Sequence, residues 1–182
     1  MHLRYDKLLV LDLDETLVHA RETALERAPD ARVGPYVVYH RPGAVAFLER
    51  CFDRFEVAIW TASTLAYARP VLAGLVDPDR FAFVWARGRC TLRADPDTRE
   101  YELLKDIRKL RRRGYARAKI LFVDDTPAKI ARSYGNYVRV SEWLGDPDDD
   151  ELWALADYLD ELGPLADVRP VEKRGWRAAR RR

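Results

Sequence analysis

The chain has 182 residues, of which 48% are hydrophobic and 34% charged, so it can form one domain with a sizeable core. No apolar stretch approaches the roughly 20 residues that span a bilayer, and acids occur too early for a secretory signal. We therefore expect a cytoplasmic protein with no membrane partner. Positions 173–182 contain six Lys or Arg residues and no acidic residue, so the rest of the chain is mildly acidic.

Apolar runs alternate with segments of helical period along the chain. The sequence predicts strands at 7–13, 56–63, 80–86, 118–125 and 136–140, and helices at 41–55, 64–75, 103–114 and 146–163. This alternation indicates an α/β fold with a mostly parallel central sheet and flanking helices. The segment 21–39 interrupts the alternation, and "RVGPYVVYH" within and just after it predicts a small β-hairpin.

Polar side chains follow three of the predicted strands at their carboxyl ends. They are Asp12 and Asp14 after the first strand, Thr61 after the second, and Asp124 and Asp125 at the fourth. In open α/β sheets such ends share one crevice, and Lys105, in the helix predicted before the fourth strand, could reach it. Clustered carboxylates repel one another unless a cation or a proton lies among them. Oxygen ligands favour Mg²⁺, whereas the three histidines lack the spacing of zinc ligands.

Four short segments together resemble a known superfamily. "DLDETLVH", "WTAS", Lys105 and "VDDTP" are similar, in order and spacing, to the four motifs of the haloacid dehalogenase superfamily. Residues 8–162 more narrowly resemble the small phosphatases related to those acting on the RNA polymerase II C-terminal domain. The resemblance implies a Rossmann-like fold. Positions 15–60 must also supply a helix and a strand, so the insertion 21–39 is sufficient for a flap and too short for a large cap domain.

The resemblance also implies roles for individual residues. Asp12 would be the nucleophile that forms an aspartyl-phosphate, and Asp14 would exchange protons with the leaving group and with water. Thr61, the backbone N–H groups after it such as that of Ala62, and Lys105 would bind the phosphate oxygens.

A metal site follows from the same resemblance. Asp12, Asp124 and the backbone carbonyl of Asp14 would hold Mg²⁺, and Asp125 would act through a metal-bound water. The cation would also reduce the repulsion between ionised Asp12 and a phosphate monoester, which carries close to two negative charges.

Several other polar residues have simpler structural interpretations. Cys51 and Cys90 are expected in the core, because neither is followed at the sixth position by the arginine that cysteine-dependent phosphatases need. Ser63 is expected to be a helix N-cap.

Three functions remain open at this stage. We expect one phosphatase domain at 1–168 and a basic tail at 169–182, with a phosphorylated protein as the first choice of substrate. The alternative is a phosphatase of nucleic-acid ends that uses the basic tail and an exposed Trp176. A non-catalytic phosphoprotein-binding module would not need Asp12 and Asp14, which argues against it.

Overall fold

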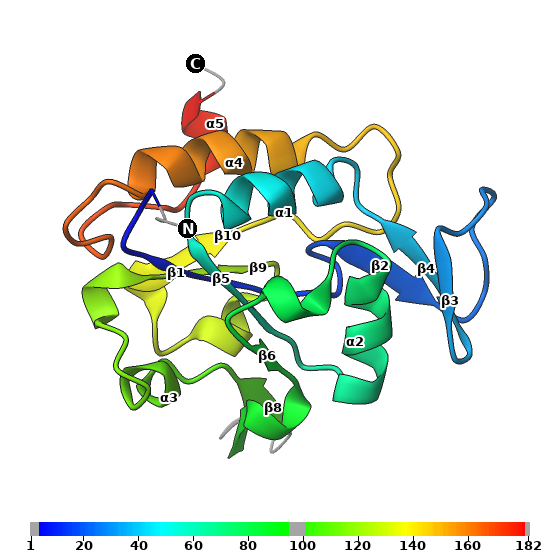
Figure 1. Cartoon of the computed structure of the whole chain (residues 1–182), viewed down its shortest axis with the longest axis horizontal. Coiled ribbons are helices and arrows are strands. Elements are labelled where there is room, and N and C mark those ends of the chain that lie inside the picture. Colours follow the sequence, from blue (N-terminus) through cyan, green and yellow to red (C-terminus); the bar gives the residue numbers. More distant parts are fainter. Residues whose placement is uncertain (1–3, 95–100, 181–182) are drawn as a thin grey trace.

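The computed structural model describes residues 4–94 and 101–180 (Figure 1). Its strands are β1 Leu8–Leu11, β2 Val18–Arg21, β3 Ala31–Val33, β4 Tyr36–His40, β5 Glu56–Trp60, β6 Val84–Trp85, β7 Thr91–Ala94, β8 Tyr101–Leu104, β9 Ile120–Asp124 and β10 Tyr137–Arg139. Its helices are α1 Ala44–Phe52, α2 Leu65–Ala73, α3 Arg108–Arg111, α4 Glu151–Leu162 and α5 Trp176–Arg180. None of the helices in these residues combines the length and the apolar character needed to cross a membrane.

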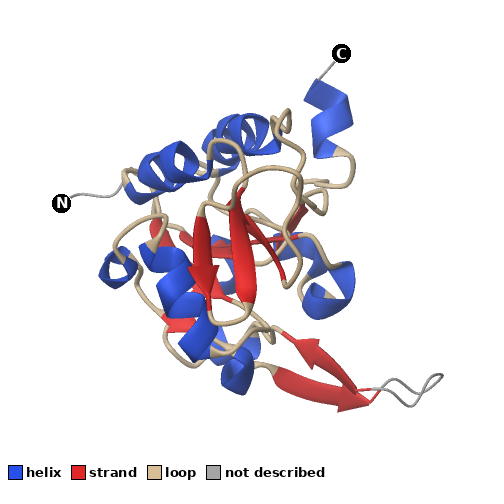
Figure 2. Ribbon diagram, turned by 90° about the vertical axis from the view of Figure 1, so that its right-hand side faces the viewer, coloured by secondary structure: helices blue, strands red, loops and turns tan. Residues whose placement is uncertain are grey.

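A five-stranded sheet in the order β10-β9-β1-β5-β6 forms the centre of the molecule, and all of its pairs are parallel. β1 is fully buried between β5 and β9 because its side chains alternate between two cores. α1 and α4 lie together over one face, and α3 lies on the other side (Figures 1 and 2). The predicted α/β class, with its mostly parallel sheet and flanking helices, is confirmed.

The helix predicted at 41–55 and the short strand predicted at 136–140 are both present, as α1 and β10. α1 buries the expected face, and Cys51 lies in the core with it. Cys90 is only half-buried, and its thiol points toward the carbonyl of Thr61 at 3.8 Å. The core assignment therefore holds for the first cysteine and only partly for the second.

The helix predicted at 103–114 is wrong over its first half. Leu103 and Leu104 belong to β8, which pairs antiparallel with β7. The carboxylate of Asp106 then accepts a hydrogen bond from the N–H of Arg108, and the helix begins only there. Pairing with a distant strand thus overrides the local helical period. The strand predicted at 80–86 is also shorter, because only Val84 and Trp85 pair with β5.

The insertion forms a small antiparallel sheet in the order β2-β4-β3. The predicted hairpin is β3 and β4, joined through Gly34, whose φ of +57° suits glycine at a tight turn. This sheet stands beside the carboxyl end of β1, at the edge of the molecule opposite α4's C-terminus (Figure 1). It is a flap rather than a cap domain.

Arg41, just after β4, is a buried cation that ties the loops around the first motif together. Its guanidinium donates to both carboxylate oxygens of Asp149 at 2.8 Å and to the carbonyls of Thr16 and Ser141. The side chain is fully buried, so these four bonds replace all of its contacts with water.

We expect Arg41→Met to lower the free energy of unfolding by about 3–5 kcal/mol, because it leaves the charge of Asp149 without its partner. Urea denaturation measures the change. Arg69→Met is the control, since the pair between Arg69 and Asp79 is exposed and should contribute within about 1 kcal/mol. Equal losses in the two variants would contradict the structural role of Arg41.

The described part of the basic tail packs against the body. Trp176 is buried, stacks on Tyr158 at 5.1 Å, and donates from Nε1 to the carbonyl of Arg139. The expectation of an exposed Trp176 is therefore wrong: the indole fills a gap between β10 and α4. Lys173 is buried as well, and its ammonium donates to the carbonyls of Gly135, Val168 and Val171.

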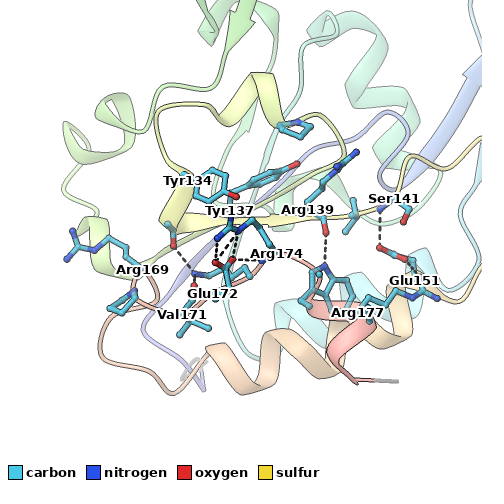
Figure 3. Close-up of a pocket in the computed structure, with 18 of the residues that line it drawn as sticks. Tyr134, Tyr137, Arg139, Ser141, Glu151, Arg169, Val171, Glu172, Arg174 and Arg177 are labelled. Carbon is cyan, nitrogen blue, oxygen red and sulfur yellow. Dashed lines mark hydrogen bonds and ion pairs between the residues drawn. The ribbon is translucent and has the colours of Figure 1, made fainter. Parts of the chain in front are cut away.

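A cavity of about 870 Å³ lies between β10 and this C-terminal segment (Figure 3). Most of its charged groups are already paired, as Arg174 is with Glu172 and Arg177 with Glu151. None of the residues expected in the active site lines it. This cavity is thus not the place where the sequence motifs meet.

Candidate active site

The carboxyl ends of the three central strands bring the predicted site residues together. In the register of the sheet Leu11 lies beside Ile59 and Val123, so the next residues along each strand share one edge. The N–H of Asp12 donates to the carbonyl of Val123 at 2.9 Å, which extends the pairing one step and fixes the side chain beside Asp124. The convergence expected from the motifs is present.

Lys105 bridges the two central carboxylates. Its ammonium lies 2.8 Å from Asp12 Oδ1 and 2.5 Å from Asp124 Oδ2, and all three side chains are about 1% exposed. Burial acts to raise the pKa of Asp12, but the adjacent lysines outweigh it and hold that pKa below its usual value. Burial and the charge of Asp12 raise the pKa of Asp124, whereas the two carboxylates raise the pKa of Lys105 against the effect of burial.

Lys129 is a second cation at Asp12, and the sequence interpretation missed it. Its ammonium lies 3.1 Å from Asp12 Oδ2, and the carboxylates around it raise its pKa although burial opposes this. It stands in the 3₁₀ helix Pro127–Ile130, directly after the "VDDTP" motif. The sequence signal that could have identified Lys129 is a basic residue in the first turn after that motif.

Asp14 has a different environment, made of hydroxyl groups. Its carboxylate accepts hydrogen bonds from Tyr67 Oη at 2.7 Å, Ser63 Oγ at 2.7 Å and Thr61 Oγ1 at 3.3 Å. Ser63 is therefore not the helix N-cap; Thr64 caps α2 by accepting from the N–H of Tyr67. Tyr67 was not recognised from the sequence, because its position in α2 alone does not show which side chain its hydroxyl reaches.

Glu15 completes the turn that carries Asp14. Its φ of +57° makes it the one non-glycine residue with left-handed backbone among those described. Its carboxylate lies 3.2 Å from Nδ1 of His19, and burial together with the charge of Asp14 raises its pKa to about 7. Such a backbone conformation costs on the order of 1 kcal/mol and is typical of functional turns.

Three carboxylates form a cluster suited to a divalent cation. Oxygens of Asp12, Asp124 and Asp125 lie within 4.8 Å of one another. Oδ1 of Asp125 is buried and has no hydrogen-bond partner in residues 4–94 and 101–180, which is costly unless a cation or water binds it. Mg²⁺, which prefers oxygen ligands, fits this donor set. The carboxylate of Asp14 is outside the cluster, so a contribution of its backbone carbonyl stays a prediction.

A pocket of about 410 Å³ lies next to these carboxylates and reaches Lys129, which contacts Asp12. Its lining includes the site residues Asp14, Thr61, Ala62 and Lys129. Tyr36, Tyr67, Arg87 and Leu103 also line it. Tyr36 comes from the flap and Leu103 from β8. Both of these segments lie outside the central sheet.

Comparison with known proteins shows what the chain is related to. The sequence profile of the NLI interacting factor-like phosphatases matches residues 7–169, which is most of the chain. The chain belongs to this family. Among its relatives, human carboxy-terminal domain RNA polymerase II polypeptide A small phosphatase 1 is 32% identical over 175 residues, which cover 91% of this chain and 63% of that protein. Nuclear envelope morphology protein 1 of Saccharomyces cerevisiae is 27% identical, covering 91% and 41%.

The solved structures support the fold. Fcp1, an RNA polymerase II C-terminal-domain phosphatase, superposes with a TM-score of 0.64 at 17% identity over 85% of this chain and 61% of its own. A haloacid dehalogenase-like hydrolase of Streptococcus pneumoniae gives 0.56 at 12% identity, covering 84% and 98%. The resemblance to the haloacid dehalogenase fold is therefore confirmed. The chain spans about half the length of several curated relatives it matches.

Proposed function

We propose that the protein is a phosphatase that hydrolyses phosphate monoesters through an aspartyl-phosphate on Asp12. The observation that carries the proposal is the pair of cations at this buried carboxylate: Lys105 and Lys129 both contact Asp12, and Lys129 also lines an open pocket. A structural carboxylate does not need two cations and access to a pocket. A nucleophile that must approach a phosphate needs both.

The two steps of the reaction use Asp12 and Asp14 in turn. A carboxylate oxygen of Asp12 attacks phosphorus, the bond to the leaving oxygen breaks, and Asp14 gives that oxygen a proton. Water then attacks the acyl-phosphate, Asp14 takes the proton from the water, and phosphate leaves. The hydroxyls of Tyr67, Ser63 and Thr61 hold Asp14 in place for both transfers.

The phosphate oxygens would be bound by groups at the end of β5 and by the lysines. Thr61 Oγ1 accepts the N–H of Ser63 at 3.0 Å, which orders the loop, and Ala62 lines the pocket. Lys129 is only partly buried and faces the pocket, so it can contact the phosphate while Lys105 stays between its two carboxylates.

Asp12, Asp124 and Asp125 would hold Mg²⁺. When bound, the cation supplies positive charge that lowers the repulsion between Asp12 and the phosphate. A phosphatase-domain structure from Bacteroides fragilis, described as complexed with Mg, shares the fold at 15% identity and a TM-score of 0.51, covering 91% of this chain and 42% of that one. The donor set of this chain, with the unpartnered oxygen of Asp125, is the reason for the assignment.

Metal removal tests this part of the proposal. We expect EDTA to reduce hydrolysis of para-nitrophenyl phosphate by at least about 10²-fold and added Mg²⁺ to restore it, because Asp125 and Asp12 would otherwise face the phosphate with less positive charge. Initial rates across a Mg²⁺ titration measure the effect. Activity that EDTA leaves unchanged would contradict the metal site.

The substrate class we propose is a phosphorylated protein in the cytoplasm. The walls of the pocket are a flap and a strand rather than a cap domain, so a phosphorylated side chain on a large molecule can enter. One human relative is named as a small phosphatase of the carboxy-terminal domain of RNA polymerase II polypeptide A, which agrees with a protein substrate. Phosphoserine, phosphothreonine and phosphotyrosine peptides compared with 3′- and 5′-phosphorylated oligonucleotides test it. Faster turnover of the oligonucleotides would favour the alternative, a nucleic-acid-end phosphatase.

A further inference from the structure

The hairpin of β7 and β8 presents an uncovered apolar face that begins at the active-site pocket. In this antiparallel pair Leu92 lies opposite Leu103, and Ala94 lies opposite Tyr101, so these four side chains share one face. Leu92 is 66% exposed and Tyr101 is 73% exposed. The face is apolar and open to solvent over its described length, which is unusual for a strand pair unless something binds there.

The same face is continuous with the proposed catalytic site. Leu103 lines the active-site pocket, and its cross-strand neighbour Leu92 is the next side chain outward. Tyr101 follows two residues before Leu103 on β8 and therefore on the same side. The hairpin projects from the body (Figure 2), and Leu92 and Tyr101 are largely exposed to solvent.

The other face of the hairpin is anchored. Leu104 is buried, Arg93 forms an ion pair with Glu102 at 2.6 Å, and the N–H of Lys105 donates to the carbonyl of Lys129 at 2.8 Å. The strand that carries Leu103 and Tyr101 thus runs directly into the residue that bridges Asp12 and Asp124. The position of the face relative to the nucleophile is set by these bonds.

From these observations we infer that Leu92, Tyr101 and Leu103 form a docking face for an apolar side chain of a protein substrate, close to its phosphorylated residue. The inference rests on the proposed function and adds a sequence preference to it. A polypeptide is favoured over a nucleic acid because the exposed face carries no Lys or Arg, whereas a nucleic-acid strand needs cations along its backbone.

The experiment compares phosphoserine peptides that carry leucine on both sides of the phosphoserine with matched peptides that carry alanine. We expect kcat/KM of the unaltered protein to be about tenfold higher for the leucine peptides. Leu92→Ser and Tyr101→Ser should each remove most of this preference and leave turnover of para-nitrophenyl phosphate unchanged, because that substrate is too small to reach either residue.

Leu144→Ser is the matched control. Leu144 is also an exposed leucine, at 57%, and it does not line the pocket. It should leave the leucine preference intact. Circular dichroism should show the same fold in all variants, since each change replaces an exposed side chain.

Two results would overturn the inference. One is an unaltered protein that shows no preference for the leucine peptides, or Leu92→Ser and Tyr101→Ser variants that keep the preference of the Leu144→Ser control. The other is a Tyr101→Ser variant that loses activity only toward a 5′-phosphorylated oligonucleotide, which would indicate that Tyr101 stacks on a base instead. If para-nitrophenyl phosphate is not hydrolysed at all, the proposed function fails. Fluorescence anisotropy of the labelled peptides then still decides whether this face binds leucine.

Discussion

Asp12→Asn is expected to lower kcat for para-nitrophenyl phosphate by at least about 10⁴-fold. The amide is nearly the same shape but is a poor nucleophile, and it carries no charge to be stabilised by Lys105 and Lys129. Steady-state kinetics with excess Mg²⁺ measures the loss. The effect should be far larger than that of removing any group that only binds the phosphate.

The fold of this variant should remain intact. Lys105 keeps its ion pair with Asp124, so circular dichroism and the urea midpoint should change little. Asp53→Asn is a suitable control, because Asp53 is exposed at the C-terminus of α1 and should leave the rate unchanged. Residual activity of Asp12→Asn within tenfold of the unaltered protein would rule out Asp12 as the nucleophile.

Lys105→Met is expected to reduce both activity and stability. It leaves the buried carboxylates of Asp12 and Asp124 without the cation between them, so we expect a loss of about 3 kcal/mol in the free energy of unfolding. The pKa of Asp12, now without its nearest cation, should rise, and kcat/KM should fall by about 10²-fold or more. Urea denaturation in EDTA and steady-state kinetics with Mg²⁺ measure the two effects separately.

The stability loss should depend on pH in a defined direction. Without Lys105 the pKa of Asp124 in the folded state should rise further above the unfolded value of 3.8, and the pKa of Asp12 should rise from its present position below that value. The folded state of the variant then binds protons that the unfolded state releases. The difference in the free energy of unfolding between the unaltered protein and Lys105→Met is therefore expected to be small near pH 4 and to grow as the pH rises toward 8. Lys119→Met, which removes a half-buried lysine paired with the exposed Asp6, should show no such trend. A deficit that shrinks with rising pH would contradict this account of Lys105.

The distribution of charge explains why substitutions of Asp12 and Lys105 are expected to have the largest effects. Asp12 is contacted by both Lys105 and Lys129 and Asp124 by Lys105, whereas Asp14 is held by neutral hydroxyls. The two lysines hold the pKa of Asp12 below its usual value, which suits a nucleophile. A carboxylate among hydroxyls is oriented without a fixed charge partner, which suits a group that must gain and lose a proton.

Local pattern was sufficient for the central sheet and for the residues at its carboxyl ends. β1, β5 and β9 are short apolar runs that must be buried on both sides, and the polar residues directly after them must share one edge. Asp12, Thr61 and Asp124 could therefore be brought together from the sequence alone. The helical period of the apolar residues in α1 and α4 also predicted these helices, because it marks the face of each helix that is buried.

Tertiary structure alone decided the contacts that depend on how separate segments pack. Tyr67 reaches Asp14 only because α2 is seated beside the end of β1, and Lys129 reaches Asp12 only through the turn after β9. Trp176 is buried, although the basic composition of the C-terminal segment led us to expect it to be exposed. Leu103 belongs to a strand because β7 pairs with β8. A periodic pattern records whether a residue faces a core. It does not record which distant group meets a hydroxyl or an ammonium, since that is set by the packing free energy of the whole chain.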